Sequence, residues 1–217
     1  MKKSLKHLAI LFALIWFVQK IFSWLFERVN TSASYVFNPD ELQEIANSGA
    51  GLPIAKRWET IHQELLRRYP GKIAPEVRWV FNSSGNVICQ LAMVYGSPTE
   101  YVAFFGTPIG ATGFSGRYGY AHVWDLMVEG KMLTYTAGQF ERTEYQAGDS
   151  AYLARGASKG VAYVGSTWMI DYGRGLPVTM MPFGIIAPAI FNTLDYESAW
   201  KQLADYGKLV LRGMAQK

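Results

Sequence analysis

The chain contains few of the residues that build disulfides or metal sites. Its 217 residues include one cysteine, Cys89, and three histidines, His7, His62 and His122. A single cysteine excludes an internal disulfide and a cysteine-based zinc site. The histidines are too scattered to have the spacing of a three-histidine metal centre. We therefore expect no metal site, and no motif in the sequence implies a cofactor.

Charged residues are also scarce. They make up 18% of the chain, and the net charge is only +4. Three of the positive charges stand at the extreme N-terminus (Lys2, Lys3 and Lys6), so the remainder is nearly neutral. This excludes the basic surface of a nucleic-acid-binding protein. By contrast, 50% of the residues are hydrophobic and 15% are aromatic, which is typical of a folded domain and not of a disordered chain.

The N-terminus carries a long apolar run from Leu8 to Phe26, interrupted only by Gln19, Lys20 and Ser23. As a helix it would be about 28 Å long, close to the thickness of a bilayer core. We expect a single-pass membrane anchor, in the endoplasmic reticulum if the host is eukaryotic. A cleaved signal peptide is the alternative, since Thr31-Ser32-Ala33 resembles a cleavage site.

Helices are predicted on both sides of a β-rich centre. Asn38-Pro39 offers a capping residue and a first-turn proline, and the spacing of apolar residues predicts a second helix over Ala55–Tyr69. Near the C-terminus, the uncharged run from Leu176 to Phe191 predicts an apolar lid or a helix that lies on a membrane. Asp195–Gly213 predicts an amphipathic helix.

Between these helices, short β-type runs alternate with turn residues, which indicates an antiparallel barrel or a jelly-roll sandwich. The segment from Ala147 to Gly156 is similar to a strand-turn-strand unit of cupin-type barrels, without the metal-binding histidines. The predicted strands are Val77–Phe81, Val87–Tyr95, Tyr101–Phe105, Met132–Thr136, Phe140–Tyr145, Ser150–Leu153, Val161–Val164 and Thr167–Tyr172.

Two aspartates stand among bulky apolar residues. Strand alternation places Met169 and Asp171 on one face, and Asp125 lies between Trp124 and Leu126. Burial raises the pKa of a carboxyl group, and a second carboxyl beside it raises one of the two further. Such a pair can share a proton, protonate an alkene or bind an amine. The alternative is a structural aspartate bonded to backbone amides, to Arg117 or to Arg174.

Several stretches are similar, in order and spacing, to one known family. They are Glu100 to Gly106, Ser115 to Tyr118, Asp125 to Gly130 and Thr167 to Gly175. Nearly end to end, the chain resembles the family of the fungal C-8 sterol isomerase and the animal sigma-1 receptor. The resemblance implies an α+β, mainly β fold: a cupin-like β-barrel with flanking helices, one N-terminal transmembrane helix and two C-terminal membrane-adjacent helices. It also implies a homotrimer.

The same resemblance assigns site residues. The family's ligand carboxylate, usually Glu, falls on Asp171, and its partner acid falls on Asp125. Three departures change the site: the shorter aspartate, one extra residue between Arg117 and Asp125, and Val87 where the receptor has tryptophan. The implied substrate-binding residues are Tyr101, Phe105, Tyr163, Tyr206, Phe81, Leu91, Met93, Met180 and Met181.

Three functions follow from these expectations. The first is a membrane-anchored isomerase of the sterol C8–C7 type, which moves a ring double bond of a sterol or isoprenoid by protonation. The second is a non-catalytic receptor or chaperone that is similar to sigma-1 and binds amphiphilic amines or sterols. The third is a protonation-initiated isomerase or cyclase of a terpenoid. We expect an anchor over residues 1–30, a helical lead-in and barrel over 31–175, and C-terminal helices over 176–217 that close the barrel.

Overall fold

The computed structural model describes residues 2–32 and 35–215, which fall into two compact units that divide after residue 34. The first unit is the helix α1 (Lys2–Ser32). Its part Leu5–Asn30 is long and apolar enough to cross a membrane, a test that an N-terminal signal sequence also passes. Ala33, in the alternative cleavage sequence, lies outside the described residues.

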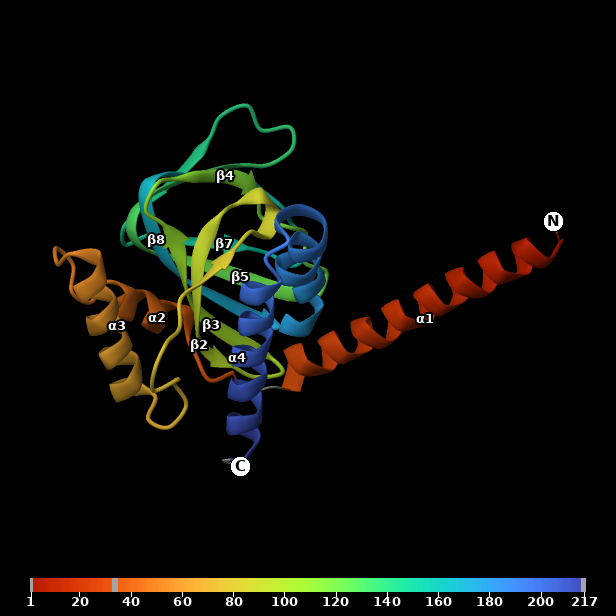
Figure 1. Cartoon of the computed structure of the whole chain (residues 1–217), viewed down its shortest axis with the longest axis horizontal. Helices are drawn as coiled ribbons and strands as arrows, with labels where there is room; N and C mark the ends of the chain where they lie inside the picture. Colours follow the sequence, from red (N-terminus) through yellow and green to blue (C-terminus); the bar gives the residue numbers. More distant parts are fainter. Residues whose placement is uncertain (1, 33–34, 216–217) are drawn as a thin grey trace. The chain divides into compact units, whose positions relative to one another are not determined.

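One antiparallel sheet of eight strands forms the centre of the second unit, within the residues that the structure describes (Figure 1). The hydrogen-bonded order is β1-β2-β3-β8-β5-β6, with β4 also paired to β8 and β7 also paired to β5. The strands are β1 (Val80–Asn82), β2 (Cys89–Gly96), β3 (Glu100–Thr107), β4 (Ala111–Phe114), β5 (Ala121–Tyr135), β6 (Thr143–Gln146), β7 (Ser150–Leu153) and β8 (Gly160–Gly175).

Two long strands turn this sheet into the predicted cupin-like barrel. The first part of β8 pairs with β4 and its later part pairs with β3, while β5 pairs with β7 early and with β6 late. Because each long strand pairs with different strands along its length, the sheet curves and encloses the inside of a barrel. The bend coincides with irregular register around Glu129 and with Gly130, whose φ of +82° suits a residue without a Cβ atom.

The sequence prediction divided these long strands. Val161–Val164 and Thr167–Tyr172 are parts of the one strand β8, and only the end of β5 was predicted. The first part of β5, which carries Asp125, and the short strand β4 were not predicted. Charged residues and glycines at the bend of β5 look like turn signals in the sequence, although hydrogen bonding to β8 continues across them.

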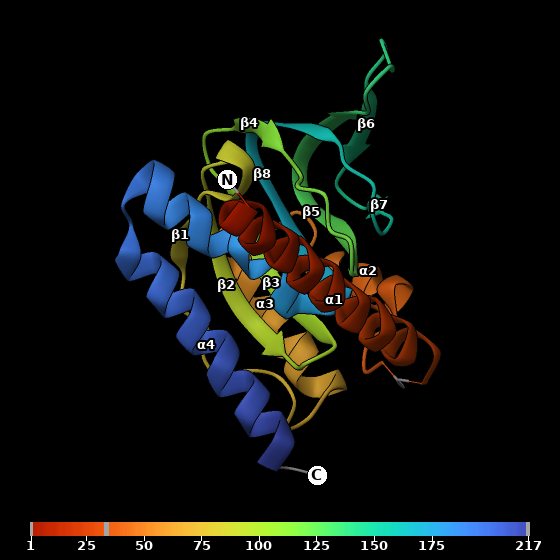
Figure 2. The same cartoon turned by 90° about the vertical axis from the view of Figure 1, so that its right-hand side faces the viewer.

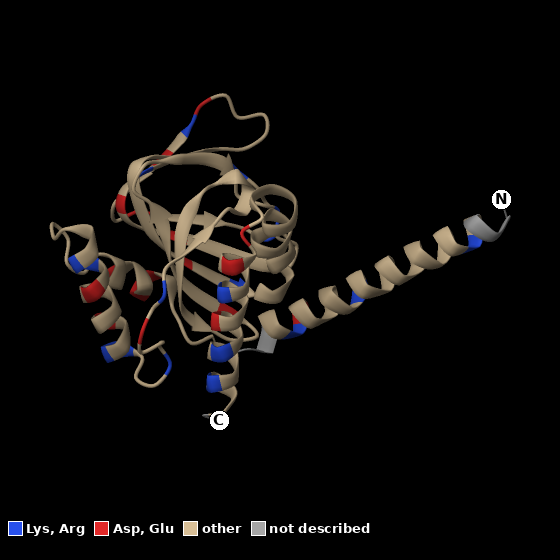
Figure 3. Cartoon of the chain, viewed as in Figure 1, with Lys and Arg blue, Asp and Glu red and all other residues tan. Residues whose placement is uncertain are grey.

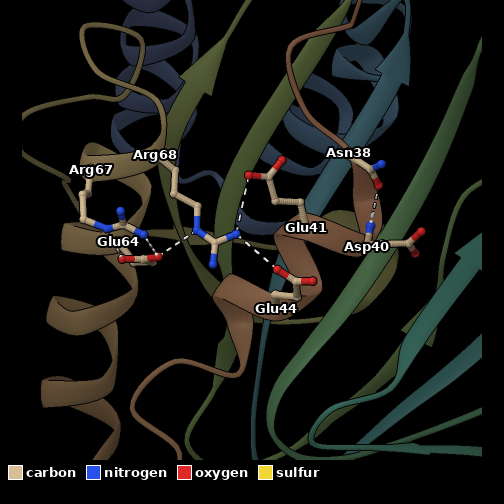
Figure 4. A network of polar contacts seen from close by, with 7 residues as sticks. All are labelled: Asn38, Asp40, Glu41, Glu44, Glu64, Arg67 and Arg68. Atoms are coloured by element: carbon tan, nitrogen blue, oxygen red, sulfur yellow. Dashed lines mark hydrogen bonds and ion pairs between the residues drawn. The ribbon is translucent and has the colours of Figure 1, made fainter.

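The outward face of the sheet packs against α2 (Pro39–Ala46) and α3 (Ile54–Arg68). Strand alternation sends Phe104, Ile170 and Tyr172 into this core, where Leu42 and Ile61 from the helices meet them. Surface ion pairs also join the two helices (Figure 4): Arg68 of α3 contacts Glu41 and Glu44 of α2 at 3.5 and 3.2 Å. Arg68 also contacts Glu64 of its own helix at 2.7 Å. Exposed pairs of this kind add little stability.

Hydrogen bonds to Glu100 attach the segment before α2 to the barrel. Its carboxylate, 1% exposed, accepts hydrogen bonds from the backbone nitrogens of Val36 and Phe37 and from the Tyr172 hydroxyl. The Arg174 guanidinium donates to the same hydroxyl and to the Phe37 carbonyl oxygen. This cluster provides buried hydrogen-bond partners for the acid, whose burial without them would be costly.

The C-terminal part consists of short helical turns and one long helix. The turns η2 (Pro177–Thr179), η3 (Pro182–Ile186) and η4 (Ala189–Thr193) occupy the uncharged run, and α4 (Tyr196–Ala215) follows them. Figure 2 shows α4 alongside β1 and β2, which it contacts. Charged residues lie on α2, α3 and α4 but not on the turns (Figure 3). Phe191 and Trp200 are 83% and 71% exposed, so this part presents apolar surface.

Candidate functional site

The inward face of the barrel lines a cavity that holds about 1020 Å³ of space free of protein atoms, part of it open to solvent. Alternation on the strands explains its lining: Leu91 and Met93 of β2 and Tyr101 and Phe105 of β3 all point inward, and their neighbours in sequence point outward.

Asp125 and Asp171 lie directly opposite each other across the β5–β8 ladder, and both line the cavity. Like charges in such a cross-strand pair repel each other. Burial raises the pKa of Asp171 to about 7, and the charge of Asp125 adds to the rise. The two acids are therefore arranged so that one carboxyl group can hold a proton near neutral pH.

Tyr101 is the hydrogen-bond partner of Asp171. Its hydroxyl donates to Asp171 Oδ1 at 2.9 Å. Burial, together with the nearby charge of Asp171, raises the pKa of Tyr101 well above its usual value, so the phenol keeps its proton and remains a donor. This hydrogen bond favours the ionised form of Asp171 and opposes the upward shift of its pKa.

Lys159 is the partner of Asp125, and the sequence prediction missed it. Its Nζ lies 2.6 Å from Asp125 Oδ2, with the two side chains 10% and 14% exposed. Lys159 precedes β8 at the position that alternates with the inward Val161 and Tyr163. Extending that alternation one step back from the strand is the sequence signal that would have found it.

The alternative prediction was that the aspartates are structural residues bonded to backbone amides, to Arg117 or to Arg174. In the structure, both arginines form hydrogen bonds with other groups. Arg117 donates to the Gly156 carbonyl oxygen and to Ser158, and Arg174 belongs to the Glu100 cluster. Tyr118, which the sequence analysis did not include among the site residues, lines the cavity next to the acids.

Most of the predicted wall residues line the cavity. The structure places there Tyr101, Phe105, Tyr163, Tyr206, Leu91, Met93, Met180 and Met181. Val87 also lines it.

Phe81 is the exception, and its prediction was wrong. Its side chain is 63% exposed and lines a second, outer pocket beside η3 and α4. The reason is strand alternation: on β1, Val80 and Asn82 are buried, so Phe81 between them must point outward.

Where the main cavity meets the C-terminal elements, Gln202 of α4 accepts a hydrogen bond from Asn82 at 2.9 Å, and Tyr206 donates to the Ser97 carbonyl oxygen. Within residues 2–32 and 35–215, no three His, Cys, Asp or Glu side chains gather closely enough to hold a metal ion. The cavity thus combines one acid pair and one lysine with an aromatic and aliphatic wall. Such a site can move a proton in apolar surroundings.

Comparison with known proteins gives consistent matches. A sequence model of the family described as "ERG2 and Sigma1 receptor like protein" matches residues 8–217. "Protein erg2 homolog" from Dictyostelium discoideum is 35% identical over 71% of this chain and 65% of its own length, slightly under two thirds of that relative. "Sigma non-opioid intracellular receptor 1" from Xenopus tropicalis is 32% identical over 89% of this chain and 86% of its own length.

Among solved structures, KdgF from Halomonas sp. covers 45% of this chain and 87% of its own length, with 17% identity and a TM-score of 0.39.

Proposed function

The chain belongs to the family of ERG2 and sigma-1 receptor-like proteins, and from this premise we propose that it is an isomerase of the sterol C8–C7 type. Its substrate in this proposal is a sterol or a related polycyclic isoprenoid. The observation that carries the proposal is the buried carboxyl of Asp171, whose pKa of about 7 lets it hold a proton at neutral pH in an apolar cavity.

In the proposed reaction, protonated Asp171 gives its proton to one carbon of a ring double bond. The π electrons form the new C–H bond, and the neighbouring carbon becomes a carbocation. The carboxylates and the faces of Tyr101, Phe105 and Tyr163 stabilise that cation. An adjacent carbon then loses a proton to a carboxylate of the pair, and the electrons of that C–H bond form the shifted double bond. One proton is gained and one is lost, so the reaction needs no redox cofactor.

The proposal extends to the surroundings of the protein. We place α1 in the membrane as the anchor and the exposed apolar residues of the turns and of α4 against its surface. A hydrophobic substrate would then enter from the bilayer past η3 and α4, which border the cavity. The boundaries at residues 30 and 175, the homotrimer and the endoplasmic reticulum belong to the same proposal.

The second candidate is a receptor without catalysis. It is favoured by the same acid, since ionised Asp171 in an aromatic cavity can pair with an amphiphilic amine. Relatives named as sigma receptors and as an erg2 homolog both match this chain, so the comparisons do not separate the two. A terpenoid isomerase or cyclase would use the same acid and differ only in its substrate.

The deciding experiment incubates the detergent-purified full chain with a Δ8-sterol in deuterated water and analyses the sterol by mass spectrometry. We expect a shifted double bond with one added deuterium, and loss of that product in Asp171→Asn. The matched control is Asp40→Asn, which changes an exposed acid on α2 and should retain turnover.

Unchanged sterol would overturn the sterol-isomerase proposal. If the same preparation still bound a hydrophobic tertiary amine, and Asp171→Asn abolished that binding, the receptor function would replace it. If linear isoprenoids were converted instead, the terpenoid alternative would replace it.

A further inference from the structure

The cavity contains a buried cation as well as the acid pair. Lys159 lines the cavity, and its ammonium contacts Asp125 Oδ2 at 2.6 Å with only 10% of the side chain exposed. Asp171 instead receives its hydrogen bond from an uncharged group, the Tyr101 hydroxyl. The two carboxyls of the pair are thus opposite each other in the sheet but have different partners.

The backbone holds Lys159 at this place. Its amide donates to Ser115 Oγ at 2.9 Å, and its carbonyl oxygen accepts from the Ser115 amide at 2.9 Å. Arg117 fixes the preceding loop through the Gly156 carbonyl oxygen at 2.6 Å and Ser158 Oγ at 2.7 Å. The following residue, Gly160, lies so close to the Tyr135 ring that a Cβ atom would come within 2.4 Å of it. These contacts restrain the backbone of Lys159 and keep its side chain at the cavity.

The charged and titratable groups around Asp171 indicate the role of Lys159. The titratable and charged groups that act on Asp171 or on the tyrosines beside it come from β2, β3, β5, β8 and the loops next to them. They are Cys89, Tyr101, Tyr118, Asp125, Lys159 and Tyr163. Among these groups, within the part of the chain that the structure describes, Lys159 alone carries a positive charge. Because its ammonium contacts Asp125, Asp171 is the carboxyl of the pair whose direct hydrogen-bond partner is uncharged.

We propose that Lys159 is the positioning residue that assigns the roles within the acid pair: its ammonium pairs with Asp125 and leaves the exchangeable proton on Asp171. The catalytic meaning of this assignment rests on the proposed isomerisation. The assignment itself is a statement about protonation and can be measured without any substrate.

The assignment has a consequence for the ligand. With Asp171 protonated, the charges of Asp125 and Lys159 cancel, and the cavity presents no net charge to an uncharged substrate. Without the ammonium, the two carboxyls would face each other and share a proton, as paired acids do. Lys159 therefore favours uncharged, polycyclic substrates over cationic amines in this cavity.

The test is a titration of the aspartate carboxyl carbons by ¹³C NMR, on the full chain in detergent with labelled aspartate. Asp171→Asn and Asp125→Asn identify the two signals. In the wild-type protein, we expect the Asp171 carbon to titrate near neutral pH. In Lys159→Met its midpoint should rise by at least about one pH unit, because the removed positive charge favoured the ionised form.

Three further variants keep the test decisive. Lys159→Gln retains a hydrogen-bond donor for Asp125 without the charge and should give the same rise even if Lys159→Met folds poorly. Lys159→Arg keeps the charge and should hold the midpoint near its wild-type value. Lys131→Met removes a lysine that pairs with Glu144 at 3.2 Å on the exposed side of the sheet, and it should leave the midpoint unchanged.

An unchanged Asp171 midpoint in folded Lys159→Met and Lys159→Gln would overturn the assignment. So would a near-neutral signal that disappears in Asp125→Asn and persists in Asp171→Asn. These results are independent of the sterol assay, so a protein that turns over no sterol but shows the predicted shift would contradict the proposed function and support the role of Lys159. Where turnover is measured, its pH profile should move with the NMR midpoint.

Discussion

The Tyr101 hydroxyl, together with the smaller effect of the Lys159 charge, limits how firmly Asp171 holds its proton. The hydrogen bond from Tyr101 and the charge of Lys159 stabilise the carboxylate, while burial and the charge of Asp125 destabilise it. The balance leaves the pKa of Asp171 at about 7. A proton donor is most effective when its pKa lies near the working pH, so the opposing contributions suit general acid catalysis.

Tyr101→Phe should therefore raise the pKa of Asp171, because it removes the hydrogen bond that favours the ionised form. In the proposed isomerisation the protonated acid is active, so turnover falls as pH rises through that pKa. The variant should move this fall to higher pH by about 0.5–1 unit. The pH profile of deuterium incorporation measures the shift, with Tyr196→Phe as the control, since Tyr196 is 57% exposed. A profile that stays in place or moves downward would contradict the role of the hydrogen bond.

The raised pKa of Asp171 also affects the stability of the fold. The folded protein binds this proton more tightly than the unfolded chain, whose carboxyl has the ordinary value of about 3.9. Stability from this group is therefore full below about pH 4 and is lost as the pH rises toward 7. Above that range the structure contains a buried charge.

Asp171→Asn removes that charge, so it should raise the melting temperature at pH 8 by at least about 3 °C relative to wild type, since 1 kcal/mol corresponds to about 2–4 °C for a protein of this size. At pH 5, where the wild-type carboxyl is protonated, the difference should be small. Thermal unfolding at the two pH values measures it, with the exposed Asp40→Asn as the control. An equal difference at both pH values would show that the carboxyl is not neutral at pH 5.

The resemblance to the family suggested both acids and the residues that line the cavity, whereas strand alternation in the sequence indicated only that Met169 and Asp171 share one face. Lys159 was missed because a lysine next to a glycine-rich turn has the pattern of an exposed loop residue, although the alternation of Val161 and Tyr163 extends back to it. Phe81 was placed in the wall by the resemblance alone, and the burial of Val80 and Asn82 on either side of it shows that it points outward.

At the scale of elements, sequence patterns missed the features that bend the sheet into a barrel. The alternation of apolar residues predicted β2, β3 and β7 almost at their observed positions. The bends of β5 and β8 depend on hydrogen bonds between residues far apart in sequence, which no local pattern reveals. The first part of β5 is also held in place by β7 and β8 together, and it carries Asp125.

The attachment of the segment before α2 depends on Glu100, at the start of β3. Glu100→Gln should lower the free energy of unfolding by about 1–3 kcal/mol, because the amide replaces a carboxylate oxygen with a donor that faces other donors. Chemical denaturation measures the loss. Glu59→Gln is the matched control, since Glu59 pairs with Lys56 on the surface with 64% of its side chain exposed. Equal stability of Glu100→Gln and wild type would show that the cluster does not hold the segment.

At the scale of the whole molecule, the helix α1 and the barrel unit are separate compact parts. Membrane attachment through α1 predicts that Leu11→Arg combined with Leu14→Arg will prevent insertion, since each arginine near the centre of a spanning helix costs about 2.5–3.5 kcal/mol on an insertion scale. Extraction of membranes at alkaline pH should release this variant and retain wild type. Leu52→Arg, at an exposed position before α3, is the control. Retention of the double variant would mean that other surfaces hold the protein.

The direct pairing of Asp125 with Asp171 across β5 and β8 has a consequence for how such proteins diverge. Large parts of the wall come from other elements: Met93 from β2, Met180 next to η2 and Tyr206 from α4. Substitutions there can change the size and shape of the accepted molecule while the two acids stay in register. A lineage built on this barrel could therefore change its substrate in small evolutionary steps and inherit its acid chemistry unaltered.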